Sequence, residues 1–503
     1  MTTTTMDEAA FLELAGQGFN VIPLAVTLQL DRDTPVSLFQ RFGDGRAVFL
    51  LESAAMGETT GRYSFIGLDR RWRVHVRNGQ TLVSGLDVTP DPRGPLETLR
   101  VILQRYRTFR PSDLPDFFGG AVGFLTYDYV RRLERLPRDD EPEWPDVDFT
   151  FPSAVLVVDH LRYSTTAVIN VVLESKDDPA EAYRLARAYL DELIATLLGP
   201  GPDRAIDVER LVATAPNARD GVDIRKIAAG LSNFEQPAYE AIVRRAQDHI
   251  VSGDVFQVVV SQQFTRETTV KPLTLYRVLR ALNPSPYMYL LDTGDAHIVG
   301  ASPEMLVRVH DGTVSTRPIA GTRHRGTTEE EDAALEAEIL RDEKELAEHV
   351  MLVDLGRNDV GRVAEPGSVR VERLAHVERF SHLMHLVSQV SGRLRDDMDA
   401  FDAFDALFPA GTLSGAPKVR AMEIIDELEP VRRGIYGGAV GYFALSGNAD
   451  FAITIRTVYL RGGRATVSAG GGIVAHSLPA AEYRECINKA SAPLLALQIA
   501  DPR

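Results

Sequence analysis

The stretch DEKELAEHVMLVDLGRND, from Asp342 to Asp359, places two carboxylates one helical turn apart. Glu345 and Glu348 are spaced i,i+3, so on a helix they share a face and their Cβ atoms lie about 5 to 6 Å apart. Such a pair is usually part of a solvated helix face. It becomes a candidate ligand set if further carboxylates meet it.

The stretch AEYRECINK, from Ala481 to Lys489, supplies a second pair with the same spacing, Glu482 and Glu485. Four converging carboxylates repel one another unless a cation joins them. Oxygen ligands without a Cys or His partner favour Mg²⁺. We therefore expect two helices, far apart in the sequence, to close over one divalent metal.

The composition is that of a soluble globular protein, with 44% hydrophobic and 25% charged residues. A chain of 503 residues is long enough for about two or three domains. The formal net charge of −16 argues against nucleic acid or an anionic membrane as the main partner. An anionic ligand would therefore need local cations or a bound metal.

The N-terminal sequence MTTTTMDEAAF lacks the basic and apolar regions of a signal peptide, and no apolar run approaches the length of a membrane span. Cys486 is the only cysteine, which excludes an internal disulfide and a Cys-based zinc site. We therefore expect a cytoplasmic protein.

The first 200 residues read as mixed helix and strand. Strands are expected to end at Ser53 and to cover residues 62–67, 152–160 and 165–175, and Asn78-Gly79 predicts a hairpin turn. A helix is expected from about Pro179 to Leu198. The breaker cluster GPGP follows at 199–202. We place a domain boundary there, which gives domains at 1–210 and 222–503.

The second half alternates blocks of helices with strands joined by hairpins, which predicts an α+β fold with antiparallel sheets. The expected helices cover residues 237–252, 273–282, 342–359 and 479–497. The expected strands include 255–264 and 381–390 and the segments YGGAVGYFAL, DFAITIRTVYL and ATVSAGGGI.

Motifs through nearly all of residues 225–495 resemble, in order, those of the chorismate-utilising enzymes. They are the two acidic helices, GASPE at 300–304, PIAGT at 318–322, MHLVS at 384–388, AGTLSGAPK at 410–418 and SAGGGI at 468–473. The resemblance implies an enzyme that converts chorismate, a dianionic ring with two carboxylates. It also implies two antiparallel sheets packed face to face with helices outside. The second half would bind chorismate.

By this resemblance the metal is Mg²⁺, which bridges the ring carboxylate of chorismate. Glu348 and Glu485 would ligate it directly, and Glu345 and Glu482 would act through water. Mg²⁺ keeps several waters, which fits that division. Lys489 would pair with these carboxylates or with the substrate, and the sequence leaves both open.

The resemblance also assigns a substrate pocket. A glycine cluster at a strand end is otherwise a bulge or turn, but backbone amides without a Cβ can approach a carboxylate closely. Arg456 would otherwise form a structural ion pair; we favour a substrate contact because it is the only cation in ADFAITIRTVYL. The expected pocket residues are Gly321, Thr322, Thr412, Tyr436, Arg456, Gly470, Gly471 and Gly472.

Two groups are expected to move protons. Glu304 resembles the family's general acid, which protonates the departing ring hydroxyl and needs a raised pKa. His385 resembles the histidine that assists loss of pyruvate. A lone histidine on a strand is more often a core residue, and here the MHLVS motif favours the catalytic interpretation.

Two positions separate the reactions within the family. Isochorismate and salicylate synthases have a water-activating lysine where this chain has Gln257, and aminodeoxychorismate synthases have a nucleophilic lysine where it has Ala320. Ammonia needs no activation, whereas water does. The expected lyase reaction is ammonia addition at ring carbon 2, followed by pyruvate elimination to give anthranilate for tryptophan biosynthesis.

The ammonia source is expected on another protein. Glutamine hydrolysis requires an activated Cys-His pair, and the single Cys486 adjoins Glu485, which disfavours its thiolate. A glutamine amidotransferase subunit and a hetero-oligomer, such as a heterotetramer, are therefore expected.

A regulatory site is also implied. In feedback-inhibited members, tryptophan binds between the two halves on the LLES and NPSPYM segments. The matching residues are Glu52, Ser53, Pro286, Tyr287 and Met288. They could instead only join the two halves. The remaining alternatives are aminodeoxychorismate or aminodeoxyisochorismate formation, and a non-catalytic tryptophan-binding paralogue.

Overall fold

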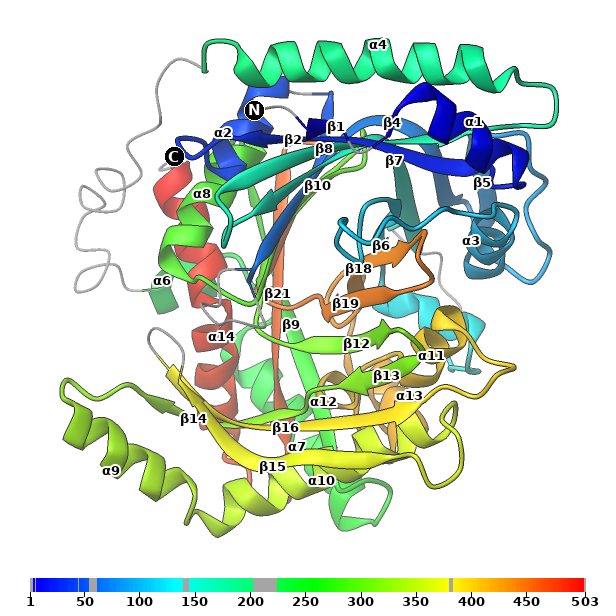
Figure 1. Cartoon of the computed structure of the whole chain (residues 1–503). Helices are drawn as coiled ribbons and strands as arrows, with labels where there is room; N and C mark the ends of the chain where they lie inside the picture. Colours follow the sequence, from blue (N-terminus) through cyan, green and yellow to red (C-terminus); the bar gives the residue numbers. More distant parts are fainter. Residues whose placement is uncertain are drawn as a thin grey trace.

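The structure is a computed structural model that describes residues 3–4, 6–43, 45–53, 61–138, 144–201, 224–379 and 383–501. Helices lie around a set of long antiparallel strands (Figure 1). The expected domain boundary, with residues 202–223, lies outside the described residues, and the division into 1–210 and 222–503 stays a prediction.

The strands are β1 (Thr3–Thr4), β2 (Val21–Gln29), β3 (Ala47–Glu52), β4 (Tyr63–Arg77), β5 (Gln80–Ser84), β6 (Gly120–Leu125), β7 (Val147–Asp159), β8 (Ser164–Val172), β9 (Gln257–Glu267), β10 (Tyr287–Asp292), β11 (His297–Ser302), β12 (Met305–His310), β13 (Thr313–Thr316), β14 (Ile319–His324), β15 (Arg370–Arg379), β16 (Leu383–Arg393), β17 (Gly415–Ala416), β18 (Ala439–Ala444), β19 (Ala449–Ile453), β20 (Thr457–Arg461) and β21 (Arg464–Ile473).

The helices are α1 (Glu8–Gly16), α2 (Pro35–Phe42), α3 (Pro95–Gln104), the 3₁₀ helix η1 (Tyr127–Arg132), α4 (Pro179–Leu198), α6 (Ile224–Ala229), α7 (Gln236–Val251), α8 (Pro272–Leu282), α9 (Glu329–Ile339), α10 (Glu343–Gly361), α11 (Ala400–Leu407), α12 (Gly411–Ser414), α13 (Lys418–Leu428) and α14 (Pro479–Ala500). None of the helices in the described ranges is both long and apolar enough to span a bilayer.

The strands form two antiparallel ladders that meet at β7. One runs β2-β8-β7-β4-β3-β10-β11-β20-β21-β9. The other runs β7-β6-β18-β19-β12-β13-β16, with β14 and β15 on β16. The mixed helix and antiparallel-sheet fold is therefore confirmed. The face-to-face packing of two separate sheets stays a prediction.

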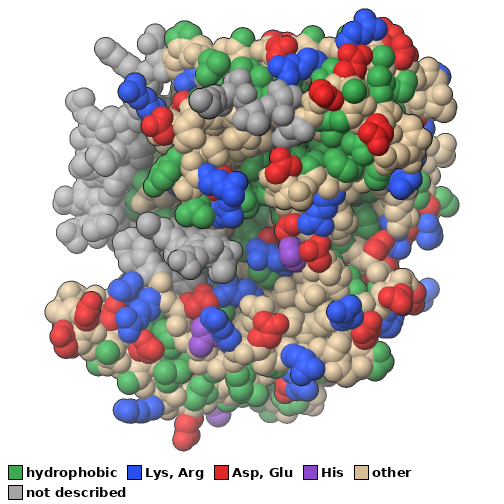
Figure 2. Space-filling model, in the orientation of Figure 1, with side chains coloured by type: hydrophobic (Ala, Val, Ile, Leu, Met, Phe, Trp, Pro, Cys, Tyr) green, Lys and Arg blue, Asp and Glu red, His purple; other side chains and the backbone are tan. Residues whose placement is uncertain are grey.

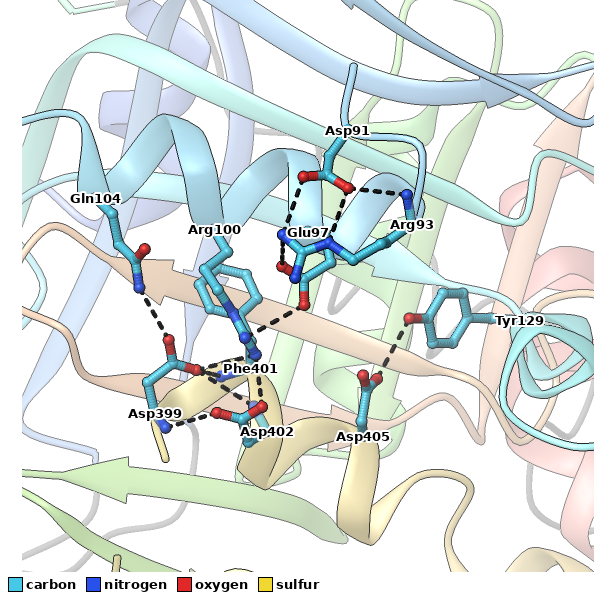
Figure 3. A network of polar contacts seen from close by, with 10 residues as sticks. All are labelled: Asp91, Arg93, Glu97, Arg100, Gln104, Tyr129, Asp399, Phe401, Asp402 and Asp405. Atoms are coloured by element: carbon cyan, nitrogen blue, oxygen red, sulfur yellow. Dashed lines mark hydrogen bonds and ion pairs between the residues drawn. The ribbon is translucent and has the colours of Figure 1, made fainter. Parts of the chain in front are cut away.

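In the described ranges, strands from the first 200 residues pair with strands from the second half at two places, β3 with β10 and β6 with β18. Polar contacts also connect the halves, among them a network that joins α3 and η1 to α11 (Figure 3). Arg100 on α3 donates to Asp402 at 2.7 Å, and the Tyr129 hydroxyl donates to Asp405 at 3.3 Å. The two halves thus share sheets and ion pairs.

Several local predictions are confirmed. Asn78 and Gly79 have φ of 51° and 73°, as the turn between β4 and β5 requires, and α4 has the expected bounds. The acidic helices form as α10 and α14. Asp342 caps α10 because its carboxylate accepts hydrogen bonds from the backbone N–H groups of Lys344 and Glu345.

The expected continuous strand DFAITIRTVYL is wrong in its middle. Strand β19 ends at Ile453 and β20 begins at Thr457. Arg456 has φ of 53°, the left-handed region, which an extended strand does not accommodate. The Thr454 hydroxyl donates to the backbone carbonyl of Ile435, which holds the chain at this break.

Candidate active site

The two acidic helices face a common space beside β9 and β21. Burial raises the pKa of Glu348 on α10 and of Glu482 on α14. The positive charges of Lys344 on α10 and Lys489 on α14 lower the pKa of both carboxyls. Each lysine therefore lies within electrostatic reach of the opposite helix, which places α10 and α14 close together.

The four glutamates differ in their partners. Glu348 Oε1 accepts from the Gln257 amide at 3.4 Å, and Glu345 lies 3.5 Å from the Arg323 guanidinium. Glu485 pairs with Lys489 at 2.8 Å, one of the two partners considered for that lysine from the sequence. Within the described ranges, Glu482 Oε2 is buried without a hydrogen-bond partner.

The donor set fits Mg²⁺, but the side chains are not gathered tightly. A buried, unpartnered carboxylate oxygen and a raised carboxyl pKa are both relieved by a bound cation. In the part of the chain that the structure describes, no group of three or more His, Cys, Asp or Glu side chains is arranged to hold a metal. These residues would hold Mg²⁺ after side-chain rotation, with Lys489 leaving Glu485.

The glycines of SAGGGI lie where β21 pairs with β9. A Cβ at Gly470 would lie 2.8 Å from the Tyr436 hydroxyl, one at Gly471 3.1 Å from Glu482 Oε2, and one at Gly472 2.4 Å from the Gln257 amide nitrogen. Bare backbone is therefore required for this packing. The glycine segment brings together residues predicted for the substrate and for the metal.

Arg456 lies near this segment at the break between β19 and β20. Burial lowers its pKa, and the nearby Tyr436 hydroxyl acts in the opposite direction. It forms no ion pair with any residue in the described ranges, so the structural ion pair considered from sequence is absent there. A half-buried guanidinium without a carboxylate partner is suited to an anionic ligand.

Glu304 is a buried carboxyl between β11 and β12. The Thr412 hydroxyl on α12 donates to its Oε1 at 2.8 Å. Burial raises the pKa of Glu304 to about 7, against the opposing effects of Thr412 and Lys489. A carboxyl that is half protonated near neutral pH can donate a proton, which is the property expected of the general acid.

His385 lies on β16 beside the neighbouring strand β14, which contains Gly321. Its Nδ1 is 3.1 Å from the Gly321 carbonyl oxygen, and its backbone lies opposite Thr322, whose side chain is outside the described residues. Burial lowers the pKa of His385, so the ring is largely neutral near pH 7. Gly321 has φ of 56°, and a Cβ there would lie 3.4 Å from Glu345 Oε2, which places α10 beside this part of β14.

A separate cavity of about 350 Å³ lies between the two halves and is lined mainly by apolar side chains. The molecular face in Figure 2 is hollowed in this region, with hydrophobic side chains at the bottom of the hollow. All five residues predicted for the inhibitor line the cavity: Glu52, Ser53, Pro286, Tyr287 and Met288. The Glu52 carboxylate accepts from the Tyr276 hydroxyl and pairs with Arg280 at 3.4 Å.

Sequence reasoning missed two contributors to the site. The positive charge of Lys344 lowers the carboxyl pKa of Glu348 on α10 and of Glu482 on α14. Its position beside Glu343 and Glu345 in the sequence could have indicated this role. From the sequence, Gln257 mattered only because it replaces the lysine that activates water in related enzymes, whereas in the structure its amide contacts Glu348. The expectation for Cys486 is supported, because the thiol donates to the Ala469 carbonyl and burial raises its pKa to about 12.

Comparison with known proteins identifies relatives along almost the whole chain. The family described as chorismate binding enzyme matches residues 46–495. Anthranilate synthase component 1 from Pseudomonas putida is 47% identical over 99% of this chain and 99% of its own, and that from Acetivibrio thermocellus is 45% identical over 98% of each. The crystal structure of anthranilate synthase component I from Streptococcus pneumoniae TIGR4 is 39% identical, covers 88% of this chain and 94% of its own, and has a TM-score of 0.72.

Proposed function

The chain belongs to the chorismate binding enzyme family, and we propose that it acts as an anthranilate synthase component 1. The reaction adds ammonia to carbon 2 of chorismate with loss of the ring hydroxyl, to give 2-amino-2-deoxyisochorismate. Elimination of pyruvate then gives anthranilate. The observation that carries this proposal is the buried Glu304 carboxyl, which meets the substrate pocket in a form able to donate a proton.

Glu304 protonates the departing hydroxyl so that it leaves as water. The Thr412 hydroxyl fixes the direction of the carboxyl through its hydrogen bond of 2.8 Å. Because burial disfavours the charged form, Glu304 regains a proton readily after turnover. His385, neutral and held by the Gly321 carbonyl at Nδ1, assists the elimination of pyruvate by accepting a proton at Nε2.

Mg²⁺ is proposed as the cofactor, with Glu348 and Glu485 as direct ligands and Glu345 and Glu482 as ligands through water. When bound, the cation neutralises the ring carboxylate of chorismate and lets an acidic surface hold an acid. The second carboxylate of the substrate is proposed to lie against the Gly470 to Gly472 backbone, beside Tyr436 and Arg456. The residues Gly321, Thr322 and Thr412 complete this pocket.

The nucleophile is ammonia because the chain lacks the lysines that serve the other reactions of the family. Gln257 is a neutral amide that contacts Glu348, so it cannot deprotonate water. Ala320 cannot attack the ring. Cys486 is buried and protonated, so glutamine hydrolysis is assigned to a separate glutamine amidotransferase subunit in a hetero-oligomer.

Tryptophan is proposed as a feedback inhibitor in the cavity of about 350 Å³. The lining offers apolar walls for an indole ring and charged groups for both ends of an amino acid. Met288 and Glu52 are also paired across the β3–β10 ladder. A ligand there would therefore act on a junction between the two halves.

The test measures anthranilate fluorescence with chorismate, an ammonium salt and Mg²⁺ at mildly alkaline pH. Glu348→Gln and Glu485→Gln should each abolish Mg²⁺-dependent turnover while thermal unfolding stays close to wild type. Absence of anthranilate from the wild type would contradict the proposal, and mass analysis would identify aminodeoxychorismate or aminodeoxyisochorismate. Wild-type rates in either variant would contradict the metal assignment.

A further inference from the structure

His349 follows Glu348 directly on α10 and points away from the candidate site into the sheet. Its side chain is fully buried, and its Nε2 lies 2.6 Å from the Ser388 hydroxyl on β16. Its Nδ1 has no hydrogen-bond partner in the described ranges. The contact with Ser388 is thus the hydrogen bond that connects the His349 ring to the rest of the described protein.

Ser388 joins three elements through one hydroxyl. It lies three residues after His385 on β16, so the two side chains point to opposite faces of the strand. Its oxygen also accepts the backbone N–H of Ala375 on β15 at 2.8 Å. Helix α10, strand β15 and strand β16 therefore meet at this atom.

Ala375 is a strained position in β15. Its φ is 49°, in the left-handed region that non-glycine residues rarely adopt, and the ladder with β16 shifts register between Arg373 and His376. The hydrogen bond to Ser388 satisfies the amide that this bulge would otherwise leave free. Beyond the bulge, Glu378 stands opposite His385. The position of the bulge therefore decides which residue faces the catalytic histidine.

We propose that His349 and Ser388 form a positioning clasp that fixes α10, with Glu345 and Glu348, against the strand that carries His385. Both residues act through others and touch neither substrate nor metal. The clasp rests on the proposed function in one respect. It contributes to catalysis only if Glu345 and Glu348 hold the metal and must be placed correctly relative to His385. Removing partners that orient metal ligands typically costs about 10- to 100-fold in metal affinity.

The test compares His349→Leu with His349→Gln in the full chain. The Gln amide nitrogen can occupy the place of Nε2 and keep the bond to Ser388, whereas Leu cannot. Ser64 on β4 and His160, directly after β7, supply a matched control, because they form the same kind of hydrogen bond at 2.8 Å. His160→Leu removes a comparable interaction away from α10.

Two readouts are needed, Mg²⁺ affinity by calorimetry and amide hydrogen exchange along α10. His349→Leu should weaken Mg²⁺ binding by about tenfold or more and raise exchange in α10 by about fivefold, the equivalent of one lost hydrogen bond. His349→Gln should stay within about threefold of wild type in both, and His160→Leu should leave both unchanged.

Wild-type Mg²⁺ affinity and exchange in His349→Leu would overturn the clasp, as would equal losses in His160→Leu. If the wild type bound no Mg²⁺, the metal assignment of the proposed function would fail by itself. Amide hydrogen exchange along α10 in the variants would then be the only test of the clasp, since this measurement does not require the metal.

Discussion

Thr412→Val should move the alkaline limb of the profile of kcat/KM against pH to higher pH. The Thr412 hydroxyl donates to Glu304 Oε1 at 2.8 Å and stabilises the ionised carboxylate. A hydrogen bond to a charged group contributes about 1.5–3 kcal/mol, and one pKa unit corresponds to about 1.4 kcal/mol. Loss of the hydroxyl should therefore raise the pKa of Glu304 from about 7 by about one to two units.

The limb moves to higher pH because Glu304 acts as an acid and must be protonated for the reaction. The rate constant kcat/KM falls as pH rises through the pKa of the free enzyme, because the proton is lost. The assay follows anthranilate fluorescence from pH 6 to 10, with rates expressed per concentration of free ammonia. Thr412→Ser keeps the hydroxyl and should leave the limb in place. An unmoved or lowered limb in Thr412→Val would refute the assignment of Glu304, whatever the change in absolute rate.

Three further predictions concern stability, metal binding and the choice of reaction. Burial raises the pKa of Asp405, beside Tyr129, from 3.8 to about 7, so the folded protein loses stability as pH rises from about 4 to 7. Asp405→Asn should therefore stabilise the protein at pH 8 by about 1–3 kcal/mol and have little effect at pH 4, as measured by urea unfolding; equal stability of both proteins at pH 8 would contradict this. Gly472→Ala should displace the Gln257 amide, which would lie 2.4 Å from the new Cβ. The Mg²⁺ concentration needed for half-maximal activity should then rise by about tenfold. An unchanged Mg²⁺ titration would show that the contact between Gln257 and Glu348 does not contribute to metal binding. Ala320→Lys should impair anthranilate formation, and unchanged steady-state kinetics would remove the distinction based on this position.

Local features of the fold were predictable because local chemistry sets them. The helix α10 begins where Asp342 can cap it, and the β4–β5 turn forms where Asn78-Gly79 tolerates positive φ. The break at Arg456 was missed because β-branched and apolar residues on both sides read as one strand. Only the left-handed backbone of Arg456, which is set by tertiary contacts, interrupts it.

The candidate site was predictable in its residue types but not in its contacts. Resemblance named Glu304 and Gln257, yet no pattern in the sequence gives the burial that raises the pKa of Glu304 or the contact between Gln257 and Glu348. The unpartnered oxygen of Glu482 likewise depends on how α14 packs against β21. These features arise from segments far apart in the chain.

The pairing of β6 with β18 has a consequence for synthesis on the ribosome. Strand β6 ends at Leu125, whereas its partner begins at Ala439. At translation rates of about 5–20 residues per second, the edge of β6 waits on the order of tens of seconds for its neighbour. An unpaired edge is a template for association with other chains. Nascent copies of this protein should therefore depend on chaperones until the last strands emerge.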